Sequence, residues 1–211
     1  MIAHALDATL RLLAPSRCPG CDLPLGAAAQ EVFCSACEPL LERASQQPPS
    51  LGAAVYVYAG PMADALRRLK YARRTELAAG LGTLLAVAAR AYAGQVDRVM
   101  PLPLHRARLR ERGFNQSALL ARPVARALGL PLDVSSLRRL RLTRDQAGLA
   151  RAERAENVLG AFVVLGKPRP ERVLLIDDVR TTGATLASAA SALLDRGFRE
   201  VRTLALARAE G

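Results

Sequence analysis

The feature that most constrains the fold is the run at residues 173–185, which spells VLLIDDVRTTGAT. Its first four residues are apolar and predict a buried strand. Two carboxylates, Asp177 and Asp178, follow at the carboxyl end of that strand, where open α/β sheets place their ligands. A short loop with Thr181, Thr182 and Gly183 then leads into a helix, whose first backbone N–H groups favour an anion. Carboxylates beside an anion site suit sugar hydroxyls or a divalent metal, so the run predicts a sugar-phosphate site; the alternative is a plain helix-capping turn.

Strands and helices alternate along the rest of the chain. Apolar and β-branched segments predict strands at residues 53–58, 96–102, 161–165, 172–176 and 200–207. Apolar residues at helical spacing predict helices at about residues 2–13, 61–69, 77–88, 116–128 and 186–194. In the last helix, Leu186, Ala190, Leu193 and Leu194 are expected to share the buried face, and residues 137–157 are expected to be irregular and basic. The alternation predicts an α/β domain with a parallel sheet covered on both faces.

Four cysteines near the N-terminus form two CxxC pairs: Cys18, Cys21, Cys34 and Cys37. Each pair can direct two sulfurs at one ion, and four thiolates complete a tetrahedral Zn²⁺ site with no open position. The pairs therefore predict a structural zinc site, and a redox role is the weaker alternative because two matched pairs occur. Residues 45–50 are typical of a linker, so we expect a zinc-binding segment at residues 1–47 and an α/β domain at residues 48–211.

The run at residues 173–185 resembles the signature of type I phosphoribosyltransferases, whose domain is Rossmann-like and binds 5-phosphoribosyl-1-pyrophosphate (PRPP) with Mg²⁺. The resemblance implies that Asp177 and Asp178 hold the 2′ and 3′ hydroxyls of the ribose. It also implies that the PRPP-binding set includes the residues that follow this pair: Arg180, Thr181, Thr182, Gly183, Ala184 and Thr185.

Three further segments narrow this resemblance. They are PLPLHRARLRERGFNQ at residues 101–116, the segment from TRDQ at residues 143–146 to residue 157, and GAF at residues 160–162. With the two CxxC pairs in front, they resemble the ComF family of competence-associated proteins, with its ComFC and GntX-like groups. The resemblance covers nearly the whole chain. It implies a zinc-binding segment on a phosphoribosyltransferase-like domain and a role in natural transformation, where incoming single-stranded DNA is handled in the cytoplasm.

A basic segment follows the strand predicted at residues 96–102. We expect it to form a loop in which Arg106, Arg108 and Arg112 bind the pyrophosphate of PRPP, because guanidinium groups bind phosphate oxygens in a fork. In phosphoribosyltransferases the loop after the corresponding strand has this role. His105 is a candidate PRPP-binding residue, as a phosphate donor or as a base. The alternatives are a solvated basic turn and a surface histidine.

Residues 143–157 resemble the mobile loop that closes over PRPP in this fold. Its closure would exclude water from an oxocarbenium-like transition state and neutralise the leaving pyrophosphate. Arg154 is therefore a catalytic candidate beside Asp177 and Asp178, and an ordinary exposed helix is the alternative. Lys70 and Tyr71 fall in another motif-like stretch of the family, to which the sequence assigns no role.

The formal net charge is +11, and arginine carries almost all of the positive charge because Lys70 and Lys167 are the only lysines. This balance predicts anionic partners, with PRPP first and single-stranded DNA second, and makes Arg138, Arg139 and Arg141 a candidate DNA patch. Coding bias toward arginine is the alternative. No apolar stretch is long enough to span a bilayer, the start does not resemble a signal peptide, and paired cysteines suit a reducing compartment, so a cytoplasmic location is expected.

Two functions from different classes remain open. The first is an enzyme that transfers the phosphoribosyl group of PRPP to an unknown acceptor, with Mg²⁺, and releases pyrophosphate. The second is a non-catalytic nucleic-acid-binding or regulatory module that uses PRPP as a signal. Other competence proteins are candidate partners in either case, and the zinc segment is a candidate for docking them.

Overall fold

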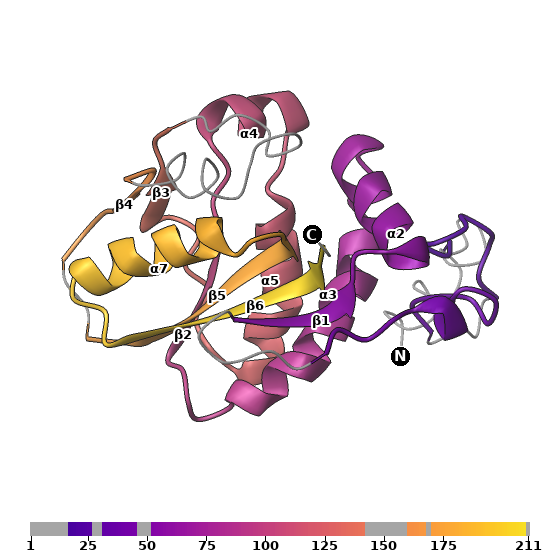
Figure 1. Ribbon diagram of the computed structural model, residues 1–211, viewed down its shortest axis with the longest axis horizontal. Coiled ribbons are helices and arrows are strands. Elements are labelled where there is room, and N and C mark those ends of the chain that lie inside the picture. The colour runs from indigo at the N-terminus through magenta and orange to yellow at the C-terminus, as the bar shows by residue number, and fades with distance from the viewer. Residues whose placement is uncertain (1–16, 27–30, 46–51, 142–159, 168–169, 210–211) are drawn as a thin grey trace, which may run out of the picture.

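Four parallel strands form the central sheet of the computed structural model, which describes residues 17–26, 31–45, 52–141, 160–167 and 170–209. In their order across the sheet, the strands are β1 (Ala53–Val57), β6 (Glu200–Arg208), β5 (Arg172–Arg180) and β2 (Arg98–Pro101). β5 pairs in parallel with β6 and β2, and β6 pairs in parallel with β1 (Figure 1). The carboxyl ends of the strands therefore lie at one edge of the sheet, where the side chains that follow them can meet.

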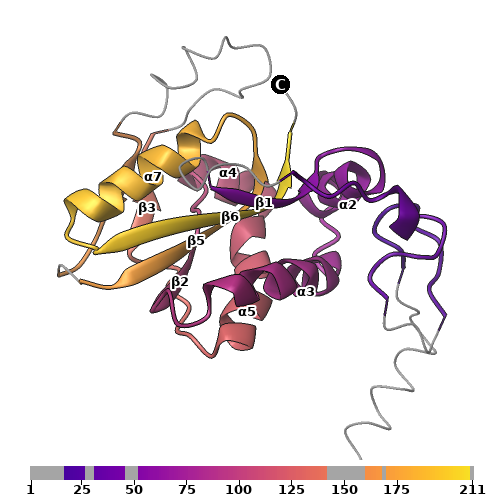
Figure 2. The same ribbon diagram turned by 60° about the horizontal axis from the view of Figure 1, so that its bottom comes forward.

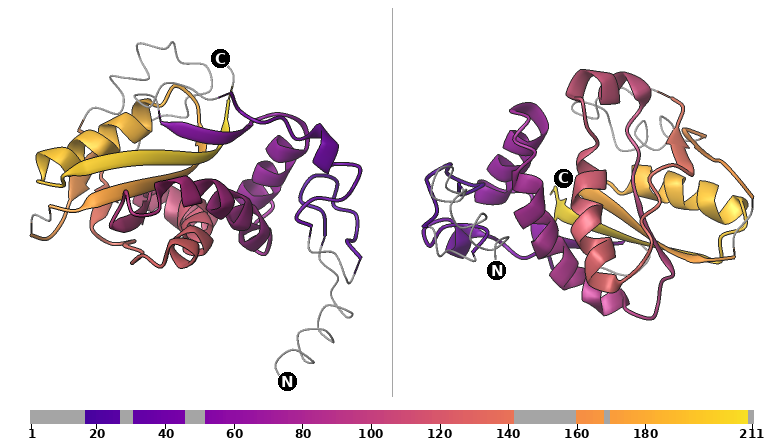
Figure 3. Two further views of the ribbon diagram at one scale, coloured as in Figure 1. Left: turned by 90° about the horizontal axis from the view of Figure 1, so that it is seen from below. Right: turned by 180° about the vertical axis from the view of Figure 1, so that it is seen from behind.

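Helices cover both faces of this sheet, which confirms the expected α/β architecture. One core forms with α2 (Gly60–Tyr71), α3 (Leu77–Ala89) and α5 (Gln116–Leu128), and the other forms with α7 (Ala184–Asp195). Figures 2 and 3 show α3 and α5 on one side of the strands and α7 on the opposite side. Two short 3-10 helices also occur in the described residues: η1 (Glu38–Leu40) precedes β1, and η3 (Arg90–Tyr92) follows α3. None of the helices in the described ranges is both long and apolar enough to cross a bilayer.

β5 is the strand that both cores share. Val173 and Leu175 belong to the core under α7, whereas Leu174 and Ile176 belong to the core under α3 and α5. All four side chains are fully buried, because successive side chains of a strand point to opposite faces and helices cover both. The continuous apolar run is thus explained by the central position of the strand.

The basic segment after β2 is a helix, α4 (Arg106–Arg112), and the expectation of a loop was wrong. His105 caps the start of this helix, where its Nδ1 accepts a hydrogen bond from the N–H of Ala107 at 3.2 Å. Gly113 ends the helix with a φ of 85°, a left-handed conformation that glycine adopts without steric cost. Arginine suggested a phosphate-binding loop, but it is also a good helix former, and the two caps delimit a short helix.

A two-stranded antiparallel ladder stands apart from the main sheet. It pairs β3 (Leu137–Arg139) with β4 (Phe162–Val164). The strand expected near residues 161–165 is confirmed, whereas the expectation that residues 137–139 are irregular was wrong. β3 depends on a partner distant in the sequence, and local propensity does not reveal such pairing. Residues 142–157 of the expected basic stretch, and the helix expected at residues 2–13, lie outside the described residues.

The buried face of α7 differs in part from the expected one. Leu186 and Leu193 are buried as expected, but Ala189 rather than Ala190 completes the face, and Leu194 is 47% exposed. Positions 186, 189 and 193 follow the spacing of one helix face. Residue 194 lies about 100° around the helix axis from residue 193, away from this face.

Both outer strands of the sheet are paired on their outward sides. Along β1, the segment 42–44 forms backbone hydrogen bonds with Val55 and Val57 at 3.1 and 2.9 Å. Along β2, the segment 131–133 bonds both the N–H and the carbonyl of Val99, at 3.0 and 2.9 Å. The polypeptide itself therefore covers the two edges of the sheet.

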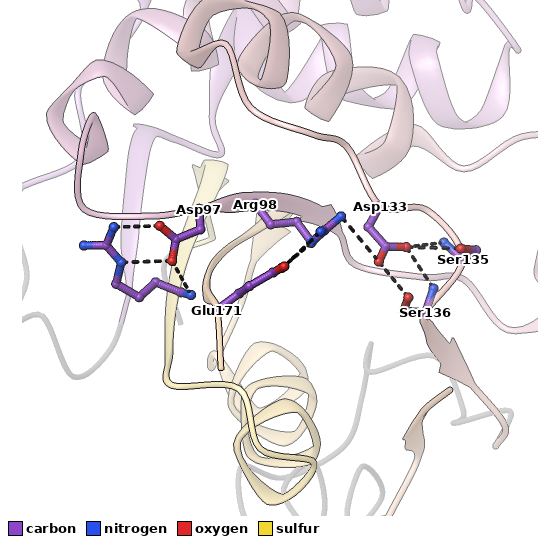
Figure 4. Close-up of polar contacts among 7 residues, drawn as sticks. Asp97, Arg98, Asp133, Ser135, Ser136 and Glu171 are labelled. Carbon is purple, nitrogen blue, oxygen red and sulfur yellow. Dashed lines mark hydrogen bonds and ion pairs between the residues drawn. The ribbon is translucent and has the colours of Figure 1, made fainter. Parts of the chain in front are cut away.

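A polar network fixes the amino ends of β2 and β5 (Figure 4). Arg98 lies between two acids, donating to Glu171 from Nε at 2.6 Å and approaching Asp133 within 4.0 Å. Burial alone would raise the pKa of Asp133, but hydrogen bonds from the two following serines lower it to about 2. Arg172 donates hydrogen bonds to the carboxylate of Asp97, one of them from Nη2 at 2.7 Å, and these bonds lower the pKa of Asp97 to about 2. The network lies at the amino ends of these strands, away from the carboxyl ends where the polar run 177–185 lies.

Candidate functional site

Two carboxylates lie buried at the carboxyl end of β5, and we call them the acid pair. Asp177 and Asp178 are 8% and 3% exposed. Ser117 Oγ donates to Asp177 Oδ1 at 3.0 Å, and Gln116 Nε2 donates to Asp178 Oδ1 at 3.1 Å. Both donors stand at the start of α5, and Lys70 in the last turn of α2 forms an ion pair with Asp178 Oδ2. Two helices therefore orient the acid pair.

The two carboxyl groups of the acid pair differ in their affinity for a proton. Burial and the neighbouring charge of Asp178 raise the pKa of Asp177 to about 8. Burial acts on Asp178 in the same direction, but the ammonium of Lys70 outweighs it, so the pKa of Asp178 falls below its usual value. At neutral pH Asp178 is ionised opposite Lys70, and Asp177 exchanges a proton with solvent or ligand near that pH.

α4 presents its arginines on two sides. Arg108 and Arg112 are one helical turn apart and line the cavity above the acid pair, whereas Arg106 and Arg110 are exposed. Arg112 Nη1 donates to Gln116 Oε1 at 2.7 Å. Because Gln116 in turn donates to Asp178, a guanidinium is connected to the acid pair through one amide.

The loop between β5 and α7 provides backbone and hydroxyl donors. Gly183 has a φ of 83° and lies directly before the first turn of α7, so a side chain at this position would be strained. Thr182 Oγ1 accepts a hydrogen bond from the N–H of Ala184 at 3.4 Å, while Thr181 and Thr185 line the cavity. A helix N-terminus with hydroxyls beside it is an arrangement that binds phosphate groups.

A cavity of about 450 Å³ lies over the acid pair. It brings together these residues of the predicted site: Asp177, Asp178, Arg180, Thr181, Gly183, Thr185, His105, Arg108 and Arg112. His105 Nδ1 is occupied as an acceptor, which leaves Nε2 to carry the ring proton of the neutral side chain. The cavity therefore joins carboxylate acceptors on its floor to arginine and hydroxyl donors on its walls.

Some predicted residues are not part of the cavity lining. Arg106 is exposed on the outer side of α4, and Thr182 and Ala184 flank the lining residues of the loop. Arg154 lies outside the described residues. The pyrophosphate-binding role of Arg106 and the catalytic role of Arg154 stay predictions.

Other lining residues had no role assigned from the sequence. Lys70 and Tyr71 come from the end of α2, Tyr58 follows β1, and Ser117 lies in the first turn of α5. Arg139, expected in a DNA patch, lines the same cavity and lies over the Phe162 ring at 5.6 Å. One signal was available in the sequence, since Lys70 is one of only two lysines in a chain that otherwise uses arginine.

The four cysteines converge on one point. The Sγ atoms of Cys18, Cys21, Cys34 and Cys37 all lie within 4.8 Å of one another, and those of Cys21 and Cys34 are 3.6 Å apart. Four sulfurs at about 2.3 Å from a shared tetrahedral ion would be about 3.8 Å apart, so the cluster needs little adjustment to hold one. The clustering confirms that both CxxC pairs can serve the same metal ion.

The cysteine cluster packs against α2. A Cβ on Gly20 would lie 2.8 Å from Pro61 Cβ and 3.0 Å from Cys37 Sγ, so only glycine fits at this contact. Arg68 Nη1 donates to the carbonyl of Pro19 at 2.7 Å and also to that of Gly20. α2 therefore contacts the cysteine cluster through Arg68 and the acid pair through Lys70.

Comparison with protein families places a known domain over the site. The model described as "Phosphoribosyl transferase domain" matches residues 115–210, which include α5, β5, the loop 181–183, α7 and β6. The acid pair and all of its α5 donors fall within this match. The match and the parallel sheet together establish a phosphoribosyltransferase-like domain.

Three relatives are similar over most of the chain. DNA utilization protein YhgH of Salmonella typhimurium is 36% identical over 200 residues, covering 92% of this chain and 84% of the relative. Competence protein F of Haemophilus influenzae is 31% identical, covering 78% of this chain and 76% of the relative. Competence protein ComFC of Bacillus subtilis is 31% identical, covering 68% and 58%.

Solved structures with similar folds are more distant. The allosteric regulatory enzyme of purine biosynthesis is 22% identical at a TM-score of 0.43, over 61% of this chain and 26% of its own. The purine phosphoribosyltransferase of Pyrococcus horikoshii is 19% identical at a TM-score of 0.39, over 62% and 73%.

Proposed function

This chain belongs to the ComF family of competence-associated proteins, which includes DNA utilization protein YhgH and competence proteins F and ComFC, and we propose that its phosphoribosyltransferase domain binds PRPP with Mg²⁺. The single observation that carries the proposal is the acid pair at the end of β5, on the floor of a cavity walled by arginines and by the loop 181–185. PRPP has one diol and two phosphate-bearing ends, and the cavity offers a carboxylate site beside cationic and helix N-terminal donors.

The parts of PRPP divide among the lining residues. We assign the 2′ and 3′ hydroxyls to the acid pair, because carboxyl oxygens accept hydrogen bonds from O–H groups, most strongly at the ionised Asp178. The 5′-phosphate is assigned to the loop 181–185 at the start of α7. The pyrophosphate is assigned to Arg108 and Arg112 of α4, whose guanidinium groups stand on the same wall.

The acid pair also fits Mg²⁺, which prefers carboxylate and phosphate oxygens. Asp177 and Asp178 would hold the ion directly or through water, together with oxygens of PRPP, and the ion would neutralise charge on the leaving pyrophosphate. The residues of this chain bind and orient the substrate. In transfer, the bond between C1 of the ribose and the pyrophosphate oxygen breaks, a bond from C1 to the acceptor forms, and the acceptor proton leaves to pyrophosphate or water.

Titration calorimetry tests the ligand assignment. With Mg²⁺ present, PRPP is expected to bind one site per chain, and omission of Mg²⁺ is expected to weaken binding, because the ligand's charges then lose their counter-ion. Release of pyrophosphate from PRPP in the presence of an acceptor panel decides between the enzyme and a regulator that only binds PRPP. The ligand assignment is wrong if PRPP at millimolar concentration gives no heat of binding and pyrophosphate does not compete with it.

We propose zinc for the cysteine cluster, since four thiolates in tetrahedral reach can fill all four positions around a structural Zn²⁺ ion. On this proposal residues 1–47 form the zinc-binding segment and residues 48–211 form the phosphoribosyltransferase-like domain. Its sulfurs must stay reduced to bind the ion, which supports a cytoplasmic location. Docking of other competence proteins to this segment is part of the same proposal.

Single-stranded DNA is the second candidate ligand, supported by relatives named as DNA utilization and competence proteins. The exposed arginines of α4 and the β3 region face solvent rather than the cavity: Arg106, Arg110, Arg138 and Arg141. None of these four residues lines the cavity of the PRPP site, in contrast to Arg139. These residues are the ones we assign to the DNA backbone.

Changing Arg138→Ala together with Arg141→Ala is expected to weaken single-stranded DNA binding and to lower its salt slope by about 1.4, because each lost phosphate contact removes about 0.7 from the slope. The measurement is fluorescence anisotropy of a labelled oligonucleotide between low and moderate salt. A matched pair on α5, Arg122→Ala with Arg126→Ala, removes the same charge from another exposed surface. An equal drop in both double variants would mean that only net charge matters and would contradict a patch.

A further inference from the structure

The helix α2 lies between the cysteine cluster and the ligand cavity, and it contacts both. Figures 1 and 2 show it between the cysteine-bearing segment and the carboxyl ends of β5 and β6. Arg68 and Lys70 are two residues apart, which is about 200° around the helix axis, so their side chains leave opposite sides of α2. Arg68 reaches the cysteine segment and Lys70 reaches the cavity. The helix is thus a wall that two sites share.

Arg68 holds the first cysteine pair from the side of α2. Its Nη1 donates to the carbonyl of Pro19 at 2.7 Å and also to that of Gly20, the two residues between Cys18 and Cys21. Arg68 itself is half-buried at this contact. Four thiolates around a divalent ion leave a net negative charge, which a guanidinium beside them stabilises. The contact therefore supports a metal-bound cysteine pair by hydrogen bonds and by charge.

Two further contacts seat the same cysteine pair on α2. Arg74, just beyond the helix, donates from Nη1 to Asp22 Oδ1 at 2.9 Å. Asp22 directly follows Cys21 and has a left-handed backbone with a φ of 64°. At the first turn of α2, Gly20 lies against Pro61 at a contact too close for any larger residue. The first cysteine pair is thus held at both ends of the helix.

Arg68 is also the residue on which the last turn of α2 closes. Its carbonyl accepts hydrogen bonds from the N–H of Ala72 at 3.1 Å and from that of Arg74 at 3.3 Å. A helix end has fewer backbone bonds than the middle of the helix and frays more easily. A side-chain contact that fixes Arg68 therefore restrains residues 69–71, which complete the helix.

The residues of that last turn form part of the cavity wall. Lys70 lines the cavity and forms an ion pair with Asp178. Tyr71 also lines it, and the guanidinium of Arg112 lies over its ring, 5.5 Å from the centroid. Arg112 is one of the two residues to which we assign the pyrophosphate. A shift of the last turn would move both side chains relative to β5 and α4, and it would change the wall against which a ligand binds.

We propose that Arg68 is a positioning residue that couples the cysteine cluster to the ligand cavity, so that zinc and PRPP each raise the affinity of the chain for the other. With the ion bound, the carbonyls of Pro19 and Gly20 are fixed where Arg68 meets them, and the last turn of α2 keeps the geometry of the cavity. Without the ion, a ligand must order that turn as it binds. This inference rests on the proposed function, because it assumes that PRPP enters the cavity and that zinc binds the cysteines.

Coupling between two binding sites is reciprocal, so the test measures both directions on the full chain. Zinc affinity is measured by competition with a zinc-selective chelator, with and without saturating PRPP and Mg²⁺. PRPP affinity is measured by calorimetry in Mg²⁺ on the zinc-loaded and the zinc-depleted chain. Each ligand is expected to raise the affinity for the other by about fivefold or more, and the two factors are expected to agree.

Three variants assign the coupling to Arg68. Arg68→Met leaves the four cysteines in place, so it is expected to bind zinc, but PRPP is expected to change its zinc affinity by less than about twofold. Arg68→Lys keeps a charge that can reach one carbonyl and is expected to restore part of the coupling. Arg122→Met removes an exposed arginine from α5 and is expected to keep the coupling of the wild type. Any zinc that PRPP itself binds is the same for every variant, so the comparison cancels it.

A wild-type chain that does not bind PRPP overturns the proposed function and this inference together. A wild-type chain that binds zinc and PRPP with affinities independent of each other overturns the inference alone. Coupling that persists in full in Arg68→Met also overturns it, because the two ligands would then act together only through folding of the whole chain. If Arg68→Met does not fold, Arg68→Gln replaces it, and coupling as large as that of the wild type has the same meaning.

Discussion

Replacing both members of the acid pair, Asp177→Asn with Asp178→Asn, is expected to weaken PRPP binding by about a thousandfold. Asp178 loses a charge-assisted hydrogen bond to the ribose diol, and such bonds contribute about 1.5–3 kcal/mol. Asp177 loses a second hydrogen bond to the diol, and both residues lose their part in holding Mg²⁺. Asparagine keeps the shape of the side chain, so the contacts with Gln116 and Ser117 can persist. Calorimetry in Mg²⁺ measures the loss. The fold is expected to survive at a lower melting temperature, because Asp178→Asn leaves the buried ammonium of Lys70 without its carboxylate.

The control for this variant is Asp64→Asn. Asp64 lies on α2, pairs with Arg67 at the surface and is 44% exposed, so its loss tests whether any carboxylate change weakens binding. Thermal melting of both variants separates loss of ligand contacts from loss of fold. PRPP affinity within about threefold of wild type in the double variant would show that the acid pair does not hold the ligand.

Replacing Cys37 by serine is expected to remove the metal and to lower the melting temperature by about 10 °C or more. Structural zinc sites contribute about 10–16 kcal/mol to the folding of small metal-binding peptides. For a chain of this length, each kcal/mol of lost stability lowers the melting temperature by about 2–4 °C. Cys18 and Cys37 are buried and belong to the same core as α2 and α3, so loss of the ion also exposes apolar surface.

The measurements are zinc content per chain and thermal melting with and without a chelator. Ser35→Ala is the matched control, because Ser35 is exposed between Cys34 and Cys37 and offers the ion no sulfur. A purified wild-type chain with no bound metal and no response to the chelator would contradict the zinc proposal. If the chelator lowers the melting temperature of the Cys37→Ser variant as much as that of the wild type, the metal binds elsewhere.

The parts of the site that could be predicted are those that lie together in the sequence. The run at residues 173–185 contains a strand, the acid pair, a loop and the start of a helix in chain order, so alternation and turn chemistry located them. The parallel sheet followed from the order of strands and helices. Two matched CxxC pairs located the cysteine cluster because knuckle spacing is local.

The parts that could not be predicted depend on contacts between distant residues. Lys70 and Ser117 reach the acid pair from two helices that only the fold brings beside β5, and the sequence assigned no role to either residue. The helix α4 was missed because its arginines suggested a phosphate-binding loop, although their spacing divides them between cavity and solvent. Arg139 was assigned to a surface because the ladder of β3 and β4, which places it in the cavity, is not visible from composition.

The pairing of both outer strands has a consequence for how other proteins can attach to this domain. A partner that extends a sheet needs an outer strand with unused N–H and carbonyl groups, and here the segments 42–44 and 131–133 occupy those of Val55, Val57 and Val99. Pro101, two residues beyond Val99 on the same side of β2, has no N–H to offer. Recruitment by strand addition is thus closed at these positions, and self-templated β-aggregation is discouraged by the same backbone pairing. Associations around the central sheet are left to the helices and loops that surround it, where arginines are exposed.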